Sequence, residues 1–428
     1  MNFTGLSLEQ APPLWAPARF FITAPLFAIF ASVALLFLDT STLSSRYSVE
    51  VIALTHLFTI GFFTFVMLGA LQQMLPVLAG VALPNALRVA QSSHLLLIFG
   101  TLSLFMGLLL SNAILMITAA VLLFLGFAII LTAVVLALLK VDNFNATVKA
   151  MSVSVGFAVI IVLLGLHLLG GHASSNITEL SFALSNVHSV WAIFGFAGIL
   201  VIGVSFQVLP MFYVTPDFSK FFNSYGVSTV AVALLFWLLL NLFLPNFAVL
   251  AKLFVALLFF IFGFEVIKKF QERKRKLSDV TLWYWQLSAV SLIAGILIWS
   301  VDEFISFDLS LLTSILIGGG FLLSVMNGML YKIIPFLVWF HLNAMGYMTI
   351  PTMREMFKNS YAELQFVLHV ITLLLLLPFA FGVDMLKIAA VTMLLSSLIL
   401  LFNLLSALKI YSDTKKRTPD FDMSMMQS

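Results

Sequence analysis

The chain has 428 residues, of which 62% are hydrophobic and only 9% are charged, and its mean hydropathy is +1.14. Because a soluble domain carries roughly 25% charged residues, this composition excludes a soluble globular protein and indicates an integral membrane protein. Cysteine is absent, which excludes disulfides, thiolate-held iron–sulfur clusters and covalently attached c-type haem.

Twelve apolar stretches are long enough, at about 20 residues each, to cross a bilayer as a helix. Similar runs recur along the whole chain, so the first is interpreted as a membrane span and not as a cleavable signal peptide. The predicted fold class is an all-α integral membrane protein with about 12 transmembrane helices. Their approximate limits are 14–38, 50–76, 90–111, 113–139, 148–170, 185–210, 225–244, 247–267, 281–301, 309–335, 361–382 and 385–408.

Basic residues are distributed unevenly over the segments between these helices. If the N-terminus is cytoplasmic, 18 of the 21 Lys and Arg residues fall on the inner side, and only Arg46, Lys252 and Lys387 fall outside. The positive-inside rule therefore predicts cytoplasmic N- and C-termini, with residues 409–428 as a short cytoplasmic tail. The basic stretch at 268–276 is interpreted as a cytoplasmic stop signal and not as a lipid-headgroup or nucleic-acid patch. Membrane lipid is an expected partner of the chain as a whole, and nucleic acid is not.

A short pattern occurs near the inner ends of three helices. GALQQMLP (69–76) and GVSFQVLP (203–210) share Gly-x3-Gln-x2-Pro, and GMLYKIIP (328–335) repeats it with Lys332 in place of Gln. The pattern falls on the second, sixth and tenth helices, four helices apart. It predicts one membrane domain, 1–428, in a pseudo-threefold arrangement of three four-helix units. The units run roughly over 14–139, 148–267 and 281–408.

Gly69 and Gly203 begin the first two copies of the pattern. A glycine lets a neighbouring helix or a flat ligand approach the backbone closely, and the proline bends the helix and frees a carbonyl one turn back. We therefore expect Gly69 and Gly203 to make room for a cofactor inside the bundle. The alternative, that the pattern serves helix packing alone, stays open.

Histidines are the residues best suited to chemistry in this chain. His56 lies 20 residues before Pro76, and His188 lies 22 residues before Pro210. At 1.5 Å per residue, both lie roughly 30 Å from the inner end of their helix, at the outer edge of the hydrocarbon. His167, on the fifth helix, is predicted at the same level.

Neutral imidazole is the usual ligand for haem iron or copper, and ionisable residues within spans often mark function. His56, His188 and His167 are therefore the candidate ligands of a haem or a metal ion. The alternative is that each is an ordinary hydrogen-bonded side chain. His369 is placed nearer the middle of the membrane, on the eleventh helix.

The twelve helices, the repeat on helices 2, 6 and 10, and a histidine that opens helix 2 from outside together resemble subunit I of the haem–copper oxidases. The chain is more similar to divergent relatives of these enzymes, among them the NnrS-type haem and copper membrane proteins linked to nitric oxide. The resemblance implies that His56, in THLFTIGFF, is an axial ligand of a haem b. It implies that His188, in NVHSVWAIF, takes the place of a copper ligand.

The chain departs from the oxidase pattern at three places. The oxidases carry adjacent histidines on helix 7, but residues 225–244 have none, and they carry two on helix 10, but residues 311–328 have none. Helix 6 also lacks the tyrosine that is cross-linked to its histidine. Oxygen reduction by the family mechanism is therefore not expected, and what remains is a scaffold for one haem, for copper, or for no cofactor.

Three classes of function are compatible with these features. The leading interpretation is a bacterial inner-membrane protein that binds a haem or metal near its outer face. Its role would be redox, nitric-oxide-related or respiratory, with a respiratory-chain or electron-donor partner, and any enzymatic activity would be that of an oxidoreductase. A small-solute transporter or permease is the rival, since substrates often bind where transporter helices are broken. A cofactor-free assembly subunit of a respiratory complex is the third.

Overall fold

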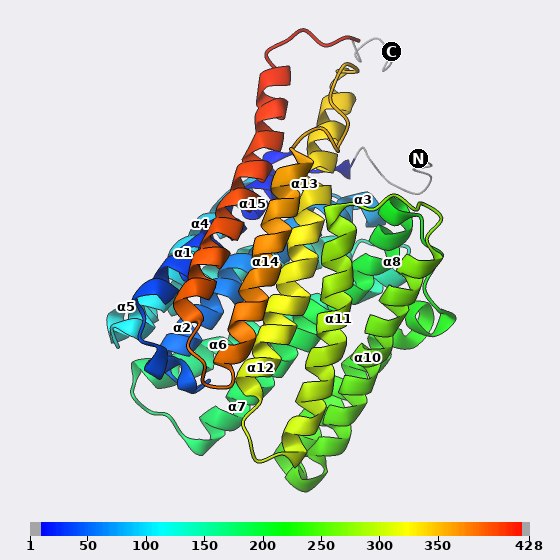
Figure 1. Cartoon of the computed structure of the whole chain (residues 1–428). Helices are drawn as coiled ribbons and strands as arrows, with labels where there is room; N and C mark the ends of the chain where they lie inside the picture. The colour runs from blue at the N-terminus through cyan, green and yellow to red at the C-terminus, as the bar shows by residue number, and fades with distance from the viewer. Residues whose placement is uncertain (1–9, 422–428) are drawn as a thin grey trace.

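In a computed structural model of the chain, the structure describes residues 10–421, which form a bundle of helices without any β-strand (Figure 1). Twelve helices in this part of the chain are long and apolar enough to cross a membrane. The predicted fold class and the predicted number of spans are therefore confirmed. We number the spans 1 to 12 in chain order.

Nine of the spans have one main helix each. These helices are α1 (Trp15–Phe37), α4 (Ala86–Leu109), α5 (Ala113–Leu138), α6 (Ala146–Ala173), α9 (Val227–Phe243), α10 (Ala248–Glu272), α11 (Val280–Val301), α14 (Asn359–Phe379) and α15 (Leu386–Thr414). Short turns extend three of them, namely η5 (Phe222–Gly226) before α9, η6 (Pro245–Phe247) before α10 and η7 (Asp302–Phe304) after α11. Side-chain caps begin several helices, such as Asn112 before α5 and Asn145 before α6.

Spans 2, 6 and 10 are each interrupted by a π-helical segment. Span 2 consists of α2 (Val49–Phe58), η3 (Thr59–Thr64) and α3 (Phe65–Ala79). Span 6 consists of α7 (Glu179–Val190), η4 (Trp191–Gly198) and α8 (Ile199–Tyr213). Span 10 consists of α12 (Ser310–Ser314), η8 (Ile315–Leu323) and α13 (Ser324–Ala344).

The predicted limits of these three spans were too short at the inner end, where they stopped at Pro76, Pro210 and Pro335, and span 6 also begins at Glu179, six residues before the predicted 185. The helix continues past each proline, to Ala79, Tyr213 and Ala344 respectively. Proline removes one backbone N–H and bends a helix, but in a membrane protein the neighbouring helices support the chain beyond it. A proline near the end of an apolar run is therefore a poor marker of where the helix stops.

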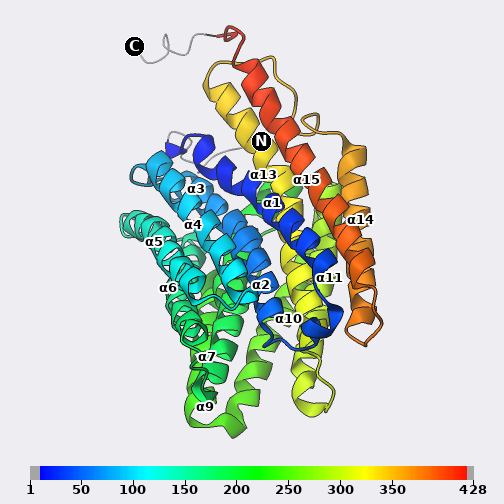
Figure 2. The same ribbon diagram turned by 90° about the vertical axis from the view of Figure 1, so that its left-hand side faces the viewer.

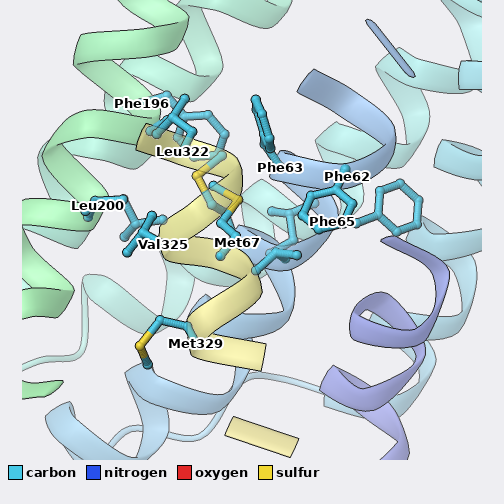
Figure 3. Close-up of a cluster of buried hydrophobic side chains, with 14 of the residues drawn as sticks. Phe62, Phe63, Phe65, Met67, Phe196, Leu200, Leu322, Val325 and Met329 are labelled. Carbon is cyan, nitrogen blue, oxygen red and sulfur yellow. The ribbon is translucent and has the colours of Figure 1, made fainter. Parts of the chain in front are cut away.

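Spans 2, 6 and 10 lie at the centre of the bundle. In the most apolar stretch of each, 61%, 72% and 89% of the residues are buried, against 50% or less in each of the other nine spans. Figure 3 shows side chains from all three spans in one apolar cluster, and they include Phe62, Phe63, Met67, Phe196, Leu200, Leu322, Val325 and Met329. The three spans that share the sequence pattern thus pack against one another.

The glycine of each pattern lies against the first helix of its own four-helix unit. A Cβ added to Gly69 would lie 2.7 Å from the ring of Phe21 on α1, and one added to Gly203 would lie 2.1 Å from the Cβ of Ala150 on α6. A Cβ on Gly328 would lie 2.7 Å from the Cβ of Tyr284 on α11. All three glycines therefore permit close contact between helices.

The π-helical segments follow the same threefold order. His56 and His188 each stand three residues before the start of a segment, and Leu312 holds that position in span 10. The segments are 6, 8 and 9 residues long, and the corresponding distances to the pattern proline are 20, 22 and 23 residues. Since a longer segment accompanies a longer spacing by the same amount, the regularity supports the three-unit repeat.

The start of α1 and the end of α15 lie at the same end of the bundle (Figures 1 and 2). We call this the basic end, because most of the Lys and Arg residues lie there, in the connecting segments or in the parts of the helices next to them. The predicted tail, 409–428, is partly helical, since α15 continues to Thr414. Its residues 422–428 lie outside the described residues.

Candidate functional site

One cavity in the described part of the chain has a volume of about 1200 Å³ and is lined by residues from all twelve spans. It lies in the half of the bundle opposite the basic end. Arg46 and Asn246 line the cavity in the loops at the end opposite the basic end. From there the cavity reaches inward to Asn327 and Gln365. Most of its lining is apolar, as is usual for sites that hold organic cofactors.

His56 and His188 both line this cavity, and their rings lie close together with nearly parallel planes. Their ring centroids are 6.1 Å apart, and the ring planes differ by 25°. The Nδ1 of His56 is 2.7 Å from the carbonyl oxygen of Ile52, one turn back on α2. The Nδ1 of His188 is 3.0 Å from the carbonyl oxygen of Ile161, on the neighbouring helix α6. Two histidines that are 132 positions apart in the sequence therefore meet at one point.

These hydrogen bonds decide which nitrogen of each ring can bind a metal. Because a carbonyl oxygen only accepts, each Nδ1 carries the proton and donates it, so each Nε2 keeps a free lone pair. Among the described residues, neither Nε2 has a hydrogen-bond partner. A backbone carbonyl that holds the other ring nitrogen is a common arrangement around metal-bound histidine.

The spacing of the two rings fits one iron between them. An imidazole nitrogen binds a metal at about 2 Å, and its ring centre lies roughly 1 Å farther away, so two opposed ligands place their ring centres about 6 Å apart. The ring centroids of His56 and His188 are 6.1 Å apart. The whole cavity, which all twelve spans line, has a volume of about 1200 Å³ and so exceeds the roughly 300–1,000 Å³ of ordinary ligand sites.

His167 is not brought to this site. It is exposed on the outer surface of α6 and is absent from the cavity lining, whereas His172, five residues later, lines the cavity. The described residues include no group of three or more His, Asp or Glu side chains placed to hold a metal ion. The geometry therefore supports a haem iron with two imidazole ligands better than a copper ion with three.

Gly69 and Gly203 are likewise absent from the cavity lining, and their contacts are those between helices. A different glycine makes room at the site. A Cβ added to Gly165 on α6 would lie 3.0 Å from the Cε1 atom of His188. The His188 ring therefore rests directly against the backbone of α6, and this contact was not predicted.

Two of the remaining histidines are held by protein partners. The Nε2 of His94 lies 2.8 Å from the hydroxyl of Thr23 on α1, and its ring packs between Phe20 and Phe65. The Nε2 of His341 lies 3.0 Å from the carbonyl oxygen of Pro12. Both side chains join segments of the chain at the basic end and are not available as ligands.

A buried cation at the cavity was also missed by the sequence argument. Lys252 on α10 is only 5% exposed, and its Nζ lies 2.8 Å from Oε1 of Glu303 and 5.1 Å from the ring centroid of Trp299. Lys252 and Arg46 are the basic side chains of the cavity lining. The signal was present in the sequence as a lysine within an apolar run, but it was counted only as an outer charge.

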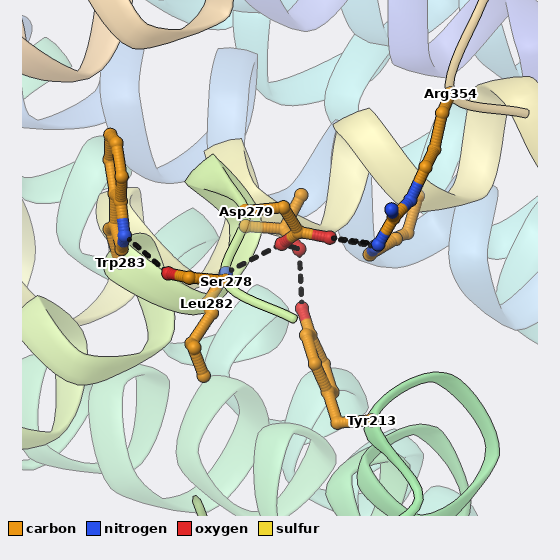
Figure 4. Close-up of polar contacts among 8 residues, drawn as sticks. Tyr213, Ser278, Asp279, Leu282, Trp283 and Arg354 are labelled. Atoms are coloured by element: carbon orange, nitrogen blue, oxygen red, sulfur yellow. Dashed lines mark hydrogen bonds and ion pairs between the residues drawn. The ribbon is translucent and has the colours of Figure 1, made fainter. Parts of the chain in front are cut away.

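At the basic end, Lys332 of the third pattern binds the carboxylate of Asp279, which Figure 4 shows together with Tyr213 and Arg354. Its Nζ lies 2.7 Å from Oδ2 of Asp279, and the guanidinium of Arg354 lies 3.7 Å from the same oxygen. Tyr213 donates to Thr281 at 2.8 Å, and Thr281 in turn donates to Asp279. Lys332 is therefore tied to spans 6 and 9 and does not simply extend to the membrane surface.

The charge state of Asp279 follows from these neighbours. Burial by itself raises its pKa, but the adjacent Lys332 ammonium and the hydrogen bonds that its carboxylate accepts outweigh that effect, so the pKa of Asp279 lies below its usual value. Its Oδ1 also accepts from the backbone N–H of Leu282 and so caps α11. Asp279 thus joins a helix start to an ion pair.

The fold and the cavity define a multi-pass α-helical membrane protein with two opposed histidines inside its bundle. In comparisons with known proteins, no family model matches the chain, and no curated protein is similar to it. The assignment of a function therefore rests on the geometry of the site.

Proposed function

We propose that the chain is a haem-binding membrane protein of the haem–copper oxidase-like type, with His56 and His188 as the two axial ligands of one haem b. The observation that carries the proposal is the opposed pair of imidazoles, 6.1 Å apart between ring centroids, each with its Nδ1 held by a backbone carbonyl. The basic end faces the cytoplasm of a bacterium, so the haem lies toward the outer face of the inner membrane.

A haem held in this way supplies a reversible one-electron change at its iron. The chain's own residues orient it: the carbonyl groups of Ile52 and Ile161 fix the two imidazole rings, and the surrounding Phe and Leu side chains keep water away. The positive charges of Arg46 and Lys252 suit the two carboxylates that haem carries. Two protein ligands on one iron favour electron transfer, in a respiratory or nitric-oxide-related role, over reduction of oxygen.

The test is the visible absorption spectrum of the full-length protein, purified from haem-replete cells and recorded oxidised and reduced. The wild-type protein is expected to show a Soret band that is lost when His56→Ala and His188→Ala are combined. His167→Ala is the matched control, because that histidine is exposed on the surface of the bundle, and its spectrum should equal that of the wild type. A wild-type protein without a Soret band refutes the proposal, and so does an unchanged spectrum in the double variant.

The reach of the cavity is the observation that favours a second candidate, a transporter for a small solute. Polar residues line it down to Asn327 and Gln365 near the middle of the membrane, where transporters bind their substrates. Solute uptake into proteoliposomes by haem-free protein would support this candidate. If the protein shows a Soret band but takes up no solute, the result would favour the haem-binding function.

A further inference from the structure

One part of the cavity lining comes from spans 10, 11 and 12. We call it the third-unit branch and define it by the lining residues that these three spans contribute. Its walls are apolar, with Leu322, Leu373 and Met393 among them, and its floor is polar, with Asn327, Gln365 and Ser396. His369 lies on the side of the branch, on the same helix as Gln365.

The polar floor lies deep in the membrane. His369 is about ten residues from either end of the 21-residue helix α14, so at 1.5 Å per residue it stands roughly 15 Å from each end. Residues 310–414, all of which the structure describes, contribute no charged side chain to the cavity. Neutral polar groups at this depth are costly unless they are hydrogen-bonded, so the partners of these groups decide what the branch can hold.

The floor is preorganised, but its hydrogen-bonding capacity is not used up. The side-chain oxygen of Gln365 accepts a hydrogen bond from the hydroxyl of Tyr284, and its nitrogen donates one to the hydroxyl of Ser396 at 2.9 Å. The Nε2 of His369 forms a hydrogen bond of 2.8 Å with the hydroxyl of Ser324. The Nδ1 of His369 has no hydrogen-bond partner within residues 10–421. The side chain of Asn327 is only 3% exposed, and its Oδ1 is buried without a partner.

The branch also has free space beside a helix backbone. A Cβ added to Gly318, in η8, would meet no atom within 4 Å, and Gly318 lines the cavity. At a glycine, the helix surface has no side chain, so a planar ring can lie flat against the backbone. The space therefore has a flat wall, apolar sides and a floor of neutral hydrogen-bonding groups.

These properties select one class of ligand. A charged lipid headgroup would find no opposite charge at this depth and would lose its hydration. A purely apolar ligand would leave the free hydrogen-bonding atoms of Asn327 and His369 without partners. Water alone would fill a space whose walls are mostly apolar and offer it few hydrogen bonds. A neutral, planar head with oxygen atoms that hydrogen-bond, joined to an apolar tail, satisfies both the floor and the walls.

We propose that the third-unit branch binds an isoprenoid quinone or quinol, with Asn327 and His369 as hydrogen-bonding partners of the ring oxygens. The hydroxyl of a quinol supplies the donor that Oδ1 of Asn327 lacks, and the ring lies beside Gly318. The inference concerns binding alone and stands on the residues of spans 10–12, so it does not depend on whether a haem is present.

Equilibrium dialysis of full-length protein in detergent against labelled ubiquinone-1 and its reduced form tests the proposal. Saturable binding at one site per chain is expected. Gly318→Leu should weaken it at least tenfold by filling the branch, and Asn327→Leu should weaken binding of the quinol by about tenfold through loss of one hydrogen bond.

Gly156→Leu is the matched control. A Cβ on Gly156 also meets nothing within 4 Å, but that residue is exposed on the surface of α6, so its quinone binding should remain that of the wild type. Absence of saturable binding overturns the proposal, and so does binding that is equal in wild type, Gly318→Leu and Asn327→Leu. Parallel dialysis of the His56→Ala, His188→Ala double variant separates the two proposals, because its quinone binding is expected to persist without haem.

Discussion

At the scale of single residues, depth in the membrane was predictable and direction around the helix was not. The rise of 1.5 Å per residue placed His56, His188 and His167 at one level. Gly165 faces His188, and His167 follows two residues later, about 200° farther around α6 at roughly 100° per residue. His167 must therefore point away from the site. The sequence alone does not tell which face of α6 is turned toward His188, because that depends on how α6 packs against α7.

The contact of Gly165 with His188 gives the first prediction. Gly165→Leu should push the His188 ring out of position, because the added Cβ alone would lie 3.0 Å from Cε1. The purified variant is expected to lose at least half of its bound haem, measured as the Soret absorbance per protein. Gly156→Leu on the same helix is the control and should keep the wild-type value. Full haem content in Gly165→Leu would show that the ring does not rest on this helix.

The ion pair of Asp279 gives the second prediction, which concerns pH. Its pKa is lower in the folded protein than in the unfolded chain. Its contribution to stability is therefore fully present above the unfolded pKa of about 3.9 and is lost as the pH falls through the folded value. Asp279 stays ionised between pH 7 and pH 5, so it should not change the wild-type Tm over this range. Below about pH 4 its carboxylate becomes protonated and the Tm should fall.

Asp279→Asn is the variant that checks this dependence. It should lower the free energy of unfolding at pH 7 by about 2 kcal/mol, because it leaves the half-buried Lys332 without its carboxylate. The difference in Tm between the wild type and Asp279→Asn should shrink below about pH 4, where the wild-type carboxyl is also protonated. A difference that stays constant down to pH 3 would contradict the assignment.

At the scale of elements, the three spans that carry the repeated pattern are the central ones, and the contacts of Gly69 and Gly203 are those of helix packing, one of the two uses that the sequence left open. Spans 2, 6 and 10 are the three most buried spans, and all three carry the pattern. Gly69 and Gly203 were expected to make room for a cofactor, yet they contact α1 and α6. A glycine in a membrane helix signals a close approach, but the sequence alone cannot say whether a helix or a ligand approaches.

The contact of Gly203 with Ala150 gives the third prediction. Gly203→Ala would place two Cβ atoms 2.1 Å apart, so α6 and α8 must separate, and overpacking of this kind costs about 1–3 kcal/mol. The Tm should fall, and adding Ala150→Gly should restore most of the loss by making space on the facing helix. Gly156→Ala is the control without a contact. A double variant that is less stable than Gly203→Ala alone would argue against this packing.

At the scale of the whole molecule, the twelve spans and their order followed from hydropathy, because a span must be about 20 apolar residues long. The common end of α1 and α15 followed from the even number of spans. The cavity could not be predicted, since its lining comes from all twelve spans and depends on the rotation of each helix. The third-unit branch is an example: Gln365 and His369 lie in an apolar run whose inward face is unmarked in the sequence.

The orientation of the whole bundle gives the fourth prediction. The chain has no cysteine, so single cysteines introduced into loops report their location cleanly. Ser45→Cys, in the loop between spans 1 and 2, should react with a membrane-impermeant maleimide in intact cells. Asn143→Cys, in the loop between spans 4 and 5, should react only after the membrane is opened. The reverse pattern would place the basic end outside and the haem site toward the cytoplasm.

The central claim is that His56 and His188 bind the same iron, and the electron paramagnetic resonance spectrum of the oxidised protein tests it most directly. Two imidazole ligands predict a low-spin ferric signal in the wild type. His56→Ala and His188→Ala should each convert the remaining haem to a high-spin signal, and His167→Ala should leave the spectrum unchanged. A high-spin wild-type spectrum, or a low-spin signal that survives in either single variant, would contradict the account.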